Sequence, residues 1–186
     1  NDIRVRQALS LAIDQESIAE NYMQGWGDAS PVGGVGNAVL GYFMPYEEWP
    51  DEVKQYYRYD PEAAEKLLDE AGYPRGADGV RFSTVYEHYE FTDLGYYQIA
   101  MDYLRQIGID VEIQYVTLAD MVQKAQTHTM LGMRSDVWGM AHPSVMGSLA
   151  MYWSQNGWRP PNVNDALFDE YYENAATATT IEEQKQ

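Results

Sequence analysis

The chain has 186 residues, with 12 lysines and arginines against 29 aspartates and glutamates, and a formal net charge of −17 at pH 7. This charge excludes a generic nucleic-acid binder, because such a protein grips phosphates with clustered Lys and Arg. The absence of cysteine excludes disulfides, zinc thiolate sites and cysteine catalysis.

The chain is long enough to bury one ordinary hydrophobic core. A protein of this size buries about 70% of the surface that its unfolded form exposes. Its longest apolar runs fall short of the ~20 residues that a membrane span needs, so no transmembrane segment is predicted. The chain begins at Asn1 without Met or a signal sequence, and it still reads as helix at Gln186. We therefore expect it to be a piece of a longer protein.

The first third of the chain predicts two helices and a long loop. Apolar residues at helical spacing predict a helix over 3–12, and Asp14 is placed to cap a second helix that ends at Gly25. The stretch 26–59 is rich in glycine, proline and aromatic residues, so we expect an ordered loop. A loop of that length inside a compact domain is usually functional.

A β-α-β-α-β unit is predicted in the middle of the chain. Alternating or continuous apolar residues predict strands at 80–86, 109–115 and 136–141. Thr92 and Thr117 are placed to cap the two helices between them. This order implies parallel strands with right-handed crossovers. The predicted fold class is therefore α/β, with a mainly parallel mixed sheet flanked by helices.

Two further helices accompany this unit. Asp60 followed by Pro61 predicts a helix start, because Asp caps and proline is tolerated at the first helical position, and Gly72 ends that helix. After a proline-containing loop at 157–163, the apolar positions of 167–175 predict a last amphipathic helix.

The carboxyl ends of the predicted strands are the first candidate for a site. In open parallel α/β sheets the ligand crevice lies beyond the carboxyl ends of the strands. That rule places three tripeptides on one edge, which are Tyr86-Glu87-His88, Tyr115-Val116-Thr117 and Ala141-His142-Pro143. Each tripeptide alone can equally be an ordinary loop.

Histidines and aromatic residues supply the candidate ligand-binding groups. None of the three histidines has the spacing of a metal site, so no metal is predicted. His128 is interpreted as a solvated helix end, whereas His88 and His142 fall on the predicted edge, either as ligand contacts or as structural histidines. Trp138 and Trp153 are placed to offer aromatic faces nearby, or else to line the core. The predicted ligand-binding residues are Tyr86, His88, Trp138, His142 and Trp153.

The sequence contains no familiar catalytic or cofactor motif. There is no G-x-S-x-G elbow, P-loop or G-x-G-x-x-G fingerprint, and the glycine-rich stretch 33–36 lacks the Lys-Ser/Thr ending of a phosphate cradle. Adjacent acids such as Glu47 and Glu48 are interpreted as solvated faces, because a glycosidase needs two acids that face each other across a cleft. No catalytic residue and no cofactor is predicted.

Several segments resemble one protein family. The stretch RVRQALSLAID at 4–14 is similar to a helix of the extracytoplasmic solute-binding proteins of family 5, the dipeptide, oligopeptide and nickel receptors of ABC importers. Further similar segments follow in the family's order at 60–73, 108–113, 136–137 and 164–169. The resemblance spans nearly the whole chain.

The resemblance implies a two-lobed receptor that holds a solute between its lobes and delivers it to an ABC permease, without catalysis. Residues 1–186 would form most of the C-terminal lobe, a periplasmic-binding-protein-like type II lobe, and the first lobe would be absent. The implied partners are a peptide or other small-molecule solute and the permease, with no nucleic acid. The family is periplasmic, or lipid-anchored outside Gram-positive cells.

One departure from the family bears on the solute. Peptide receptors of the family carry a Gly-Trp and then an Asp, which holds the peptide's α-ammonium, just after the strand that 136–137 matches. The stretch 138–145 offers no Asp at that position. Sugars, opines, amines and uncharged solutes therefore become contenders, and Glu87 is the candidate acid if free peptides bind.

Two alternatives from other classes remain at this point. An acidic hydrolase domain would turn over a glycoside or peptide and lose that turnover when one carboxylate of the predicted edge is replaced. A module that uses its aromatic loops to bind a protein or carbohydrate would show no closure around a small solute.

Overall fold

The chain forms two compact units, which are described separately. The computed structural model describes residues 2–31, 33, 35, 39, 41–89, 93–127, 129–130, 132–134, 144–156 and 164–184. Unit 1 comprises residues 1–31, 49–116 and 131–135, and unit 2 comprises residues 32–48, 117–130 and 136–186. Within the described residues no helix is long and apolar enough to cross a membrane.

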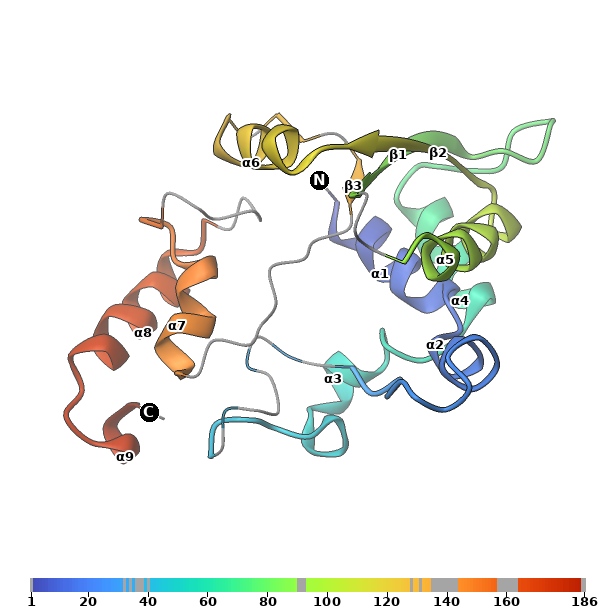
Figure 1. The fold of residues 1–186 in the computed structure, drawn as a ribbon. Helices are drawn as coiled ribbons and strands as arrows, with labels where there is room; N and C mark the ends of the chain where they lie inside the picture. The colour runs from blue at the N-terminus through green and yellow to red at the C-terminus, as the bar shows by residue number, and fades with distance from the viewer. Residues whose placement is uncertain are drawn as a thin grey trace. The chain divides into compact units, whose positions relative to one another are not determined.

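Unit 1 contains a small sheet and several helices (Figure 1). In chain order its elements are α1 (Ile3–Ala12), α2 (Gln15–Ser17), the π-helix η1 (Ile18–Tyr22), α3 (Asp51–Lys54), α4 (Pro61–Glu70), β1 (Phe82–Tyr89), α5 (Leu94–Gln106), β2 (Ile109–Val116) and β3 (Met133–Arg134). The helices predicted over 3–12 and from Asp60 to Gly72 are confirmed as α1 and α4.

The sheet has the predicted parallel topology. Its strand order is β2-β1-β3, and β1 pairs in parallel with both neighbours. The sequence order β1-α5-β2-α6-β3, with α6 at Leu118–Thr127, confirms the expected α/β character. The observed third strand is Met133–Arg134, and the stretch 136–141, where a strand is predicted, lies outside the described residues.

The predicted end of the first strand is wrong. Strand β1 runs on to Tyr89, so Glu87 and His88 lie inside the strand and not beyond it. Both polar residues stay in the ladder, opposite Gln114 and Tyr115 of β2, and they are only 1% and 2% exposed. The polar pair interrupts the apolar pattern of the sequence, but backbone pairing continues through it because a buried strand satisfies its N–H and C=O groups in the ladder.

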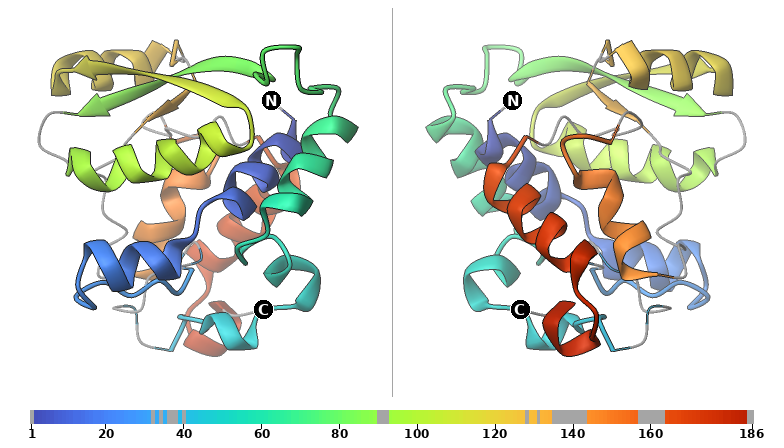
Figure 2. Two further views of the ribbon diagram at one scale, coloured as in Figure 1. Left: turned by 90° about the vertical axis from the view of Figure 1, so that its right-hand side faces the viewer. Right: turned by 90° about the vertical axis from the view of Figure 1, so that its left-hand side faces the viewer.

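Three helices cover one face of the sheet. Figure 2 shows α1, α4 and α5 on the same side of the strands. The core between them consists of Ala8, Leu11, Ala12, Ala64, Leu68, Tyr86, Met101, Leu104, Ile107, Ile109 and Val111. Along β2 the apolar residues alternate with exposed Asp110, Glu112 and Gln114, as the period of two predicts. Ile109, Val111 and Ile113 thus pack in the core as the periodicity predicts, whereas Tyr115, the next position of the same face, is 68% exposed.

Aspartates cap most of these helices. Asp14 accepts a hydrogen bond from the Ser17 N–H at 2.8 Å, as the sequence predicts for the second helix. Asp93 caps α5 by accepting from the Gly95 N–H at 2.9 Å, whereas the predicted cap, Thr92, lies outside the described residues. Each cap satisfies an N–H group that has no partner within its helix.

A buried guanidinium ties α4 to the start of β1. The Arg81 side chain is 2% exposed, and it forms ion pairs with Glu65 at 2.9 Å and with Asp69. It also donates to the carbonyl oxygens of Tyr73 at 2.7 Å and Ile107 at 3.0 Å. Arg75 binds the same Glu65 carboxylate, and these two arginines hold the pKa of Glu65 down at about 2. We call the four residues Glu65, Asp69, Arg75 and Arg81 the Arg81 clamp.

Unit 2 is helical in its described part. Its elements are η2 (Tyr46–Glu48), α6, α7 (Val145–Leu149), η3 (Ala150–Tyr152), α8 (Ala166–Thr177) and α9 (Ile181–Gln184). The helix predicted over 167–175 is confirmed as α8, and Thr117 caps α6 by accepting from the Asp120 N–H at 3.2 Å. The loop predicted over 26–59 is interrupted by η2 and by α3 of unit 1.

Candidate functional site

The structure brings two of the predicted site residues together inside unit 1. Tyr86 and His88 lie on the same face of β1, with ring centroids 6.0 Å apart, and both are 2% exposed. Tyr97 of α5 packs 5.0 Å from the Tyr86 ring and 6.0 Å from the His88 ring, and Tyr115 of β2 packs 5.5 Å from His88. These two residues therefore lie between the sheet and α5 and not on an open edge.

The other predicted residues are placed differently. Trp138 and His142 lie outside the described residues. Trp153 belongs to unit 2, where its ring stacks on Tyr172 at 5.2 Å and its indole N–H donates to the Glu173 carboxylate at 3.3 Å. The grouping of all five residues at one site stays a prediction.

A pocket in unit 1 opens beside the N-terminus of α5. Its volume is about 420 Å³, within the range of about 300–1,000 Å³ typical of small-molecule sites. Its lining residues are Gln15, Ile18, Ala19, Met23, Asp28, Ala29, Asp93, Tyr96 and Tyr97. Helix α5 follows the carboxyl end of β1, so the pocket lies where the parallel-sheet rule places ligands. We call it the α5 pocket.

Tyr97 connects the α5 pocket with the predicted edge. Its ring packs against both Tyr86 and His88, and it also lines the pocket. Tyr96 meets it edge to face, with centroids 5.1 Å apart and an interplanar angle of 88°. The buried residues of the predicted edge thus support the aromatic wall of the pocket from behind.

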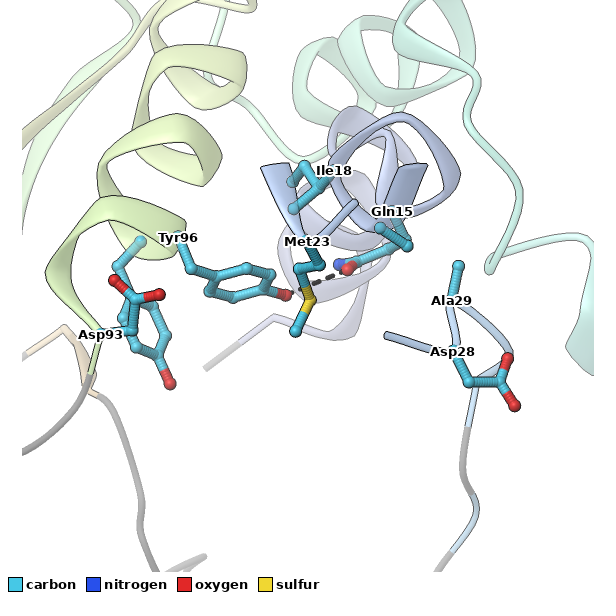
Figure 3. A pocket seen from close by; sticks show the side chains of 9 residues that line it. Gln15, Ile18, Met23, Asp28, Ala29, Asp93 and Tyr96 are labelled. Carbon is cyan, nitrogen blue, oxygen red and sulfur yellow. Dashed lines mark hydrogen bonds between the residues drawn. The ribbon is translucent and has the colours of Figure 1, made fainter. Parts of the chain in front are cut away.

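Two hydrogen bonds join the walls of the α5 pocket. The Tyr96 hydroxyl donates to the Gln15 side-chain oxygen at 3.0 Å, as Figure 3 shows. The Tyr22 hydroxyl donates to Asp93 at 2.9 Å, which raises the pKa of Tyr22 above its ordinary value. The segment α2–η1 is thereby fixed to the first turn of α5.

A π-helical turn forms the wall opposite α5. In η1 the Met23 N–H donates to the Ile18 carbonyl, five residues back, at 3.1 Å. Such single π-turns widen a helix locally and are frequent at functional sites. Here Ile18 is buried and Met23 is exposed, and both line the pocket. Figure 3 shows them between Tyr96 on one side and Ala29 on the other.

The lining of the α5 pocket is acidic. It includes two carboxylates, Asp28 and Asp93, and none of the described residues that line it is Lys or Arg. The Ser30 N–H donates to Asp28 at 2.8 Å, and this holds the pKa of Asp28 below its ordinary value. Among the described residues, no group of three or more His, Asp or Glu could hold a metal ion.

Sequence reasoning missed most of the α5 pocket. Gln15, Asp93 and Tyr96 stand in segments that are far apart in the chain, and none of them belongs to a motif. Two signals pointed to the region: the functional character expected of the loop that begins at Trp26, and the rule that ligands bind where a strand gives way to a helix.

Replacing Gly95 tests the hydrogen bond from Tyr22 to Asp93, which joins the segment α2–η1 to α5. A Cβ at this position would lie 2.1 Å from the Tyr22 hydroxyl oxygen. Gly95→Ala is therefore expected to displace Tyr22 from Asp93 and return the pKa of Tyr22 toward its ordinary value. The displaced atoms are at the end of the exposed Tyr22 side chain, so the fold should be kept. The measurement is an NMR titration of the Tyr22 ring, with Tyr22→Phe to assign the signal, and an unchanged titration would contradict the contact.

Comparisons with known proteins agree with the sequence resemblance. The glutathione-binding protein GsiB of Salmonella paratyphi A is 28% identical over 169 residues, which cover 89% of this chain and 30% of that protein. HbpA2 of Haemophilus parasuis matches with a TM-score of 0.79 and 23% identity over 100% of this chain and 36% of that one. The chain spans about a third of the length of these relatives.

A further solved structure and a family model complete the comparison. A dipeptide-binding protein from Pseudoalteromonas sp. SM9913, in complex with Met-Leu, matches with a TM-score of 0.76 and 24% identity over 100% of this chain and 36% of that one. The model of the bacterial extracellular solute-binding proteins, family 5 Middle, matches residues 1–160. The match covers most of the chain, which therefore belongs to the bacterial extracellular solute-binding proteins of family 5.

Proposed function

We propose that this chain supplies one wall of the binding cleft in a two-lobed receptor, which captures a small solute or peptide for an ABC importer. The observation that carries the proposal is the family match over residues 1–160. The names of the relatives support it, since one binds glutathione and another was solved with the dipeptide Met-Leu. Solute capture requires no catalytic step, and the family favours this function over a hydrolase or an interaction module.

In this proposal the α5 pocket is part of the solute site. It lies at the end of the central strand β1, is large enough for a small ligand, and combines an aromatic wall with a few polar groups, as ligand sites usually do. Tyr96 and Tyr97 would contact the solute, and buried Tyr86 and His88 would support Tyr97. Trp138, His142 and Trp153 remain proposed contacts from the rest of the lobe.

The proposal also covers location. The receptor would act outside the cytoplasm, in the periplasm or held at the cell surface by a lipid anchor. Residues 1–186 would be the C-terminal lobe of this receptor, and a first lobe would supply the opposite wall.

The experiment that tests this function uses the complete protein. Native mass spectrometry of protein purified from its own host should show a co-purified small molecule. Small-angle scattering should then show a decrease in the radius of gyration when this molecule is added to solute-free protein. A complete protein that keeps its dimensions with every co-purified or added solute would contradict the proposal.

Comparing the isolated segment 1–186 with the complete protein measures how much the absent lobe contributes to binding. The isolated segment 1–186 has only one wall of the cleft, so it should bind the same solute much more weakly than the complete protein, because binding sites bury 70–90% of a ligand's surface. Calorimetry on both proteins measures this difference. Equal affinity would contradict the proposal, because it would mean that the first lobe contributes nothing to binding.

A further inference from the structure

The α5 pocket combines a carboxylate with two aromatic rings on one face of α5. Asp93, the N-cap of this helix, stands three and four residues before Tyr96 and Tyr97, and residues at these spacings share a helix face. Figure 3 shows the Asp93 carboxylate beside the Tyr96 ring at one side of the pocket. All three residues line the pocket.

The hydrogen bonds and ring packing of Asp93, Tyr96 and Tyr97 leave these three residues able to bind a cation. The Asp93 carboxylate accepts from the Gly95 N–H and the Tyr22 hydroxyl, both of which fix its position. A carboxylate has about four lone-pair sites, so positions for a further donor remain. The Tyr96 hydroxyl is engaged by Gln15, and Tyr97 packs its ring edge to face with Tyr96. The orientation of both rings is therefore set before a ligand arrives.

The side-chain charges of the lining are negative and oppose the positive end of the α5 helix dipole. Asp28 is a second acidic residue of the lining, on the side opposite Tyr96 with its carboxylate directed outward (Figure 3), and the described lining residues include no Lys or Arg. An aromatic face attracts ammonium and guanidinium groups through its quadrupole. Ile18 and Met23 supply apolar surface opposite α5 for a hydrocarbon stem. The net charge of −17 raises the local concentration of cations near the whole chain.

We propose that the α5 pocket binds the positively charged end of the solute, an ammonium or guanidinium group on an apolar stem. Asp93 pairs with the charge, and Tyr96 and Tyr97 offer it their aromatic wall. This inference rests on the proposed function, because it names the chemical class of solute that the same receptor takes. It assigns the recognition of charge to α5 and not to the stretch 138–145, where the sequence has no Asp.

The test compares three probes of equal chain length on the complete protein. These are n-pentylamine, pentan-1-ol and pentanoate, measured at pH 7 by saturation-transfer NMR. The amine is protonated under these conditions, because alkylammonium groups titrate near 10.4. We expect the amine to bind at least about tenfold more tightly than the alcohol, and the carboxylate to bind least. Intermolecular NOEs should connect the amine to the rings of Tyr96 and Tyr97.

Two variants test whether the Asp93 carboxylate supplies the charge that binds the amine. Asp93→Asn keeps the helix cap, since Asn caps as well as Asp, but it removes the charge, so the advantage of the amine over the alcohol should disappear. Asp120→Asn is the matched control, because Asp120 also sits in the first turn of a helix, bonded to Thr117, and does not line the pocket. This control should keep the preference of the unaltered protein for the amine.

Several outcomes would overturn the inference. One is equal binding of amine and alcohol, and another is an equal loss in both variants, which would indicate only the general charge of the chain. If Asp93→Asn does not fold, the three probes and the NOEs on the unaltered protein still decide the matter. Closure of the receptor around an anionic or neutral solute, with no effect of Asp93→Asn, would reject this inference and leave the proposed function standing. Amine binding without any closure of the receptor would support this inference and reject the proposed function.

Discussion

Replacing Arg81 with alanine is expected to lower the free energy of unfolding by about 2–4 kcal/mol. The buried guanidinium donates to two carbonyl oxygens and two carboxylates, and alanine leaves the carbonyls of Tyr73 and Ile107 without this donor. The two carboxylates are partly exposed, so water compensates them in part. Urea denaturation measures the change. Arg58→Ala is the matched control, because Arg58 forms an exposed pair with Asp60, and it should cost less than about 1 kcal/mol.

The Arg81 clamp also gives stability a defined pH dependence. The pKa of Glu65 is about 2 in the folded chain, below its ordinary value of 4.5, because Arg75 and Arg81 donate to the carboxylate. The stabilisation from Glu65 is therefore fully present above pH 4.5 and is lost as the pH falls toward 2. Glu65→Gln should flatten the stability profile in that acidic window and leave its shape unchanged near pH 7. A profile of the same slope in both proteins would contradict the assignment.

Replacing Leu68 with alanine is expected to lower the free energy of unfolding by about 2–5 kcal/mol. Leu68 lies on α4 with no exposed surface, in the core that α1, α4 and α5 form with the sheet. Alanine removes its buried methyl groups and leaves a cavity that well-packed neighbours cannot fill. Denaturant unfolding, with the slope checked for a constant m-value, measures the loss.

The matched control for this cavity is Leu167→Ala. Leu167 lies on α8 and is 56% exposed, so the same deletion should change stability by less than about 0.5 kcal/mol. Two equal losses would mean that the cost does not follow the burial of the leucine in the core of unit 1. A loss confined to Leu68 would confirm that the packing of α1, α4 and α5 stabilises the fold.

The local features of the fold were predictable because short-range physics determines them. Asp14 and Asp60 cap helices through hydrogen bonds to residues three positions along the chain, so a short stretch of sequence contains the whole signal. The alternation of β2 is equally local. The predicted end of strand β1 was three residues early, because Glu87 and His88 look like loop residues until their partners on β2 are known.

The candidate site was harder to predict for the opposite reason. Its walls come from segments distant in sequence, since the hydrogen bond from Tyr22 to Asp93 spans 71 residues. No single segment carries a motif for this contact. The rule for parallel sheets located the correct region, but it pointed to Tyr86 and His88, which the structure buries behind Tyr97. The pocket is lined instead by Asp93, Tyr96 and Tyr97, which follow later in the chain, and by residues between Gln15 and Ala29, which precede the strand.

The π-turn at Ile18–Tyr22 makes the pocket sensitive to chain length. It accommodates one residue more than an ordinary helical turn. Loss of a single residue from this segment would convert it to an ordinary helical turn and shift Met23, which directly follows it. The contribution of Met23 to the pocket would change, while the sheet and its three covering helices contain no residue of the altered turn. A one-residue change in the length of this turn would therefore reshape the pocket without replacing any residue of the core.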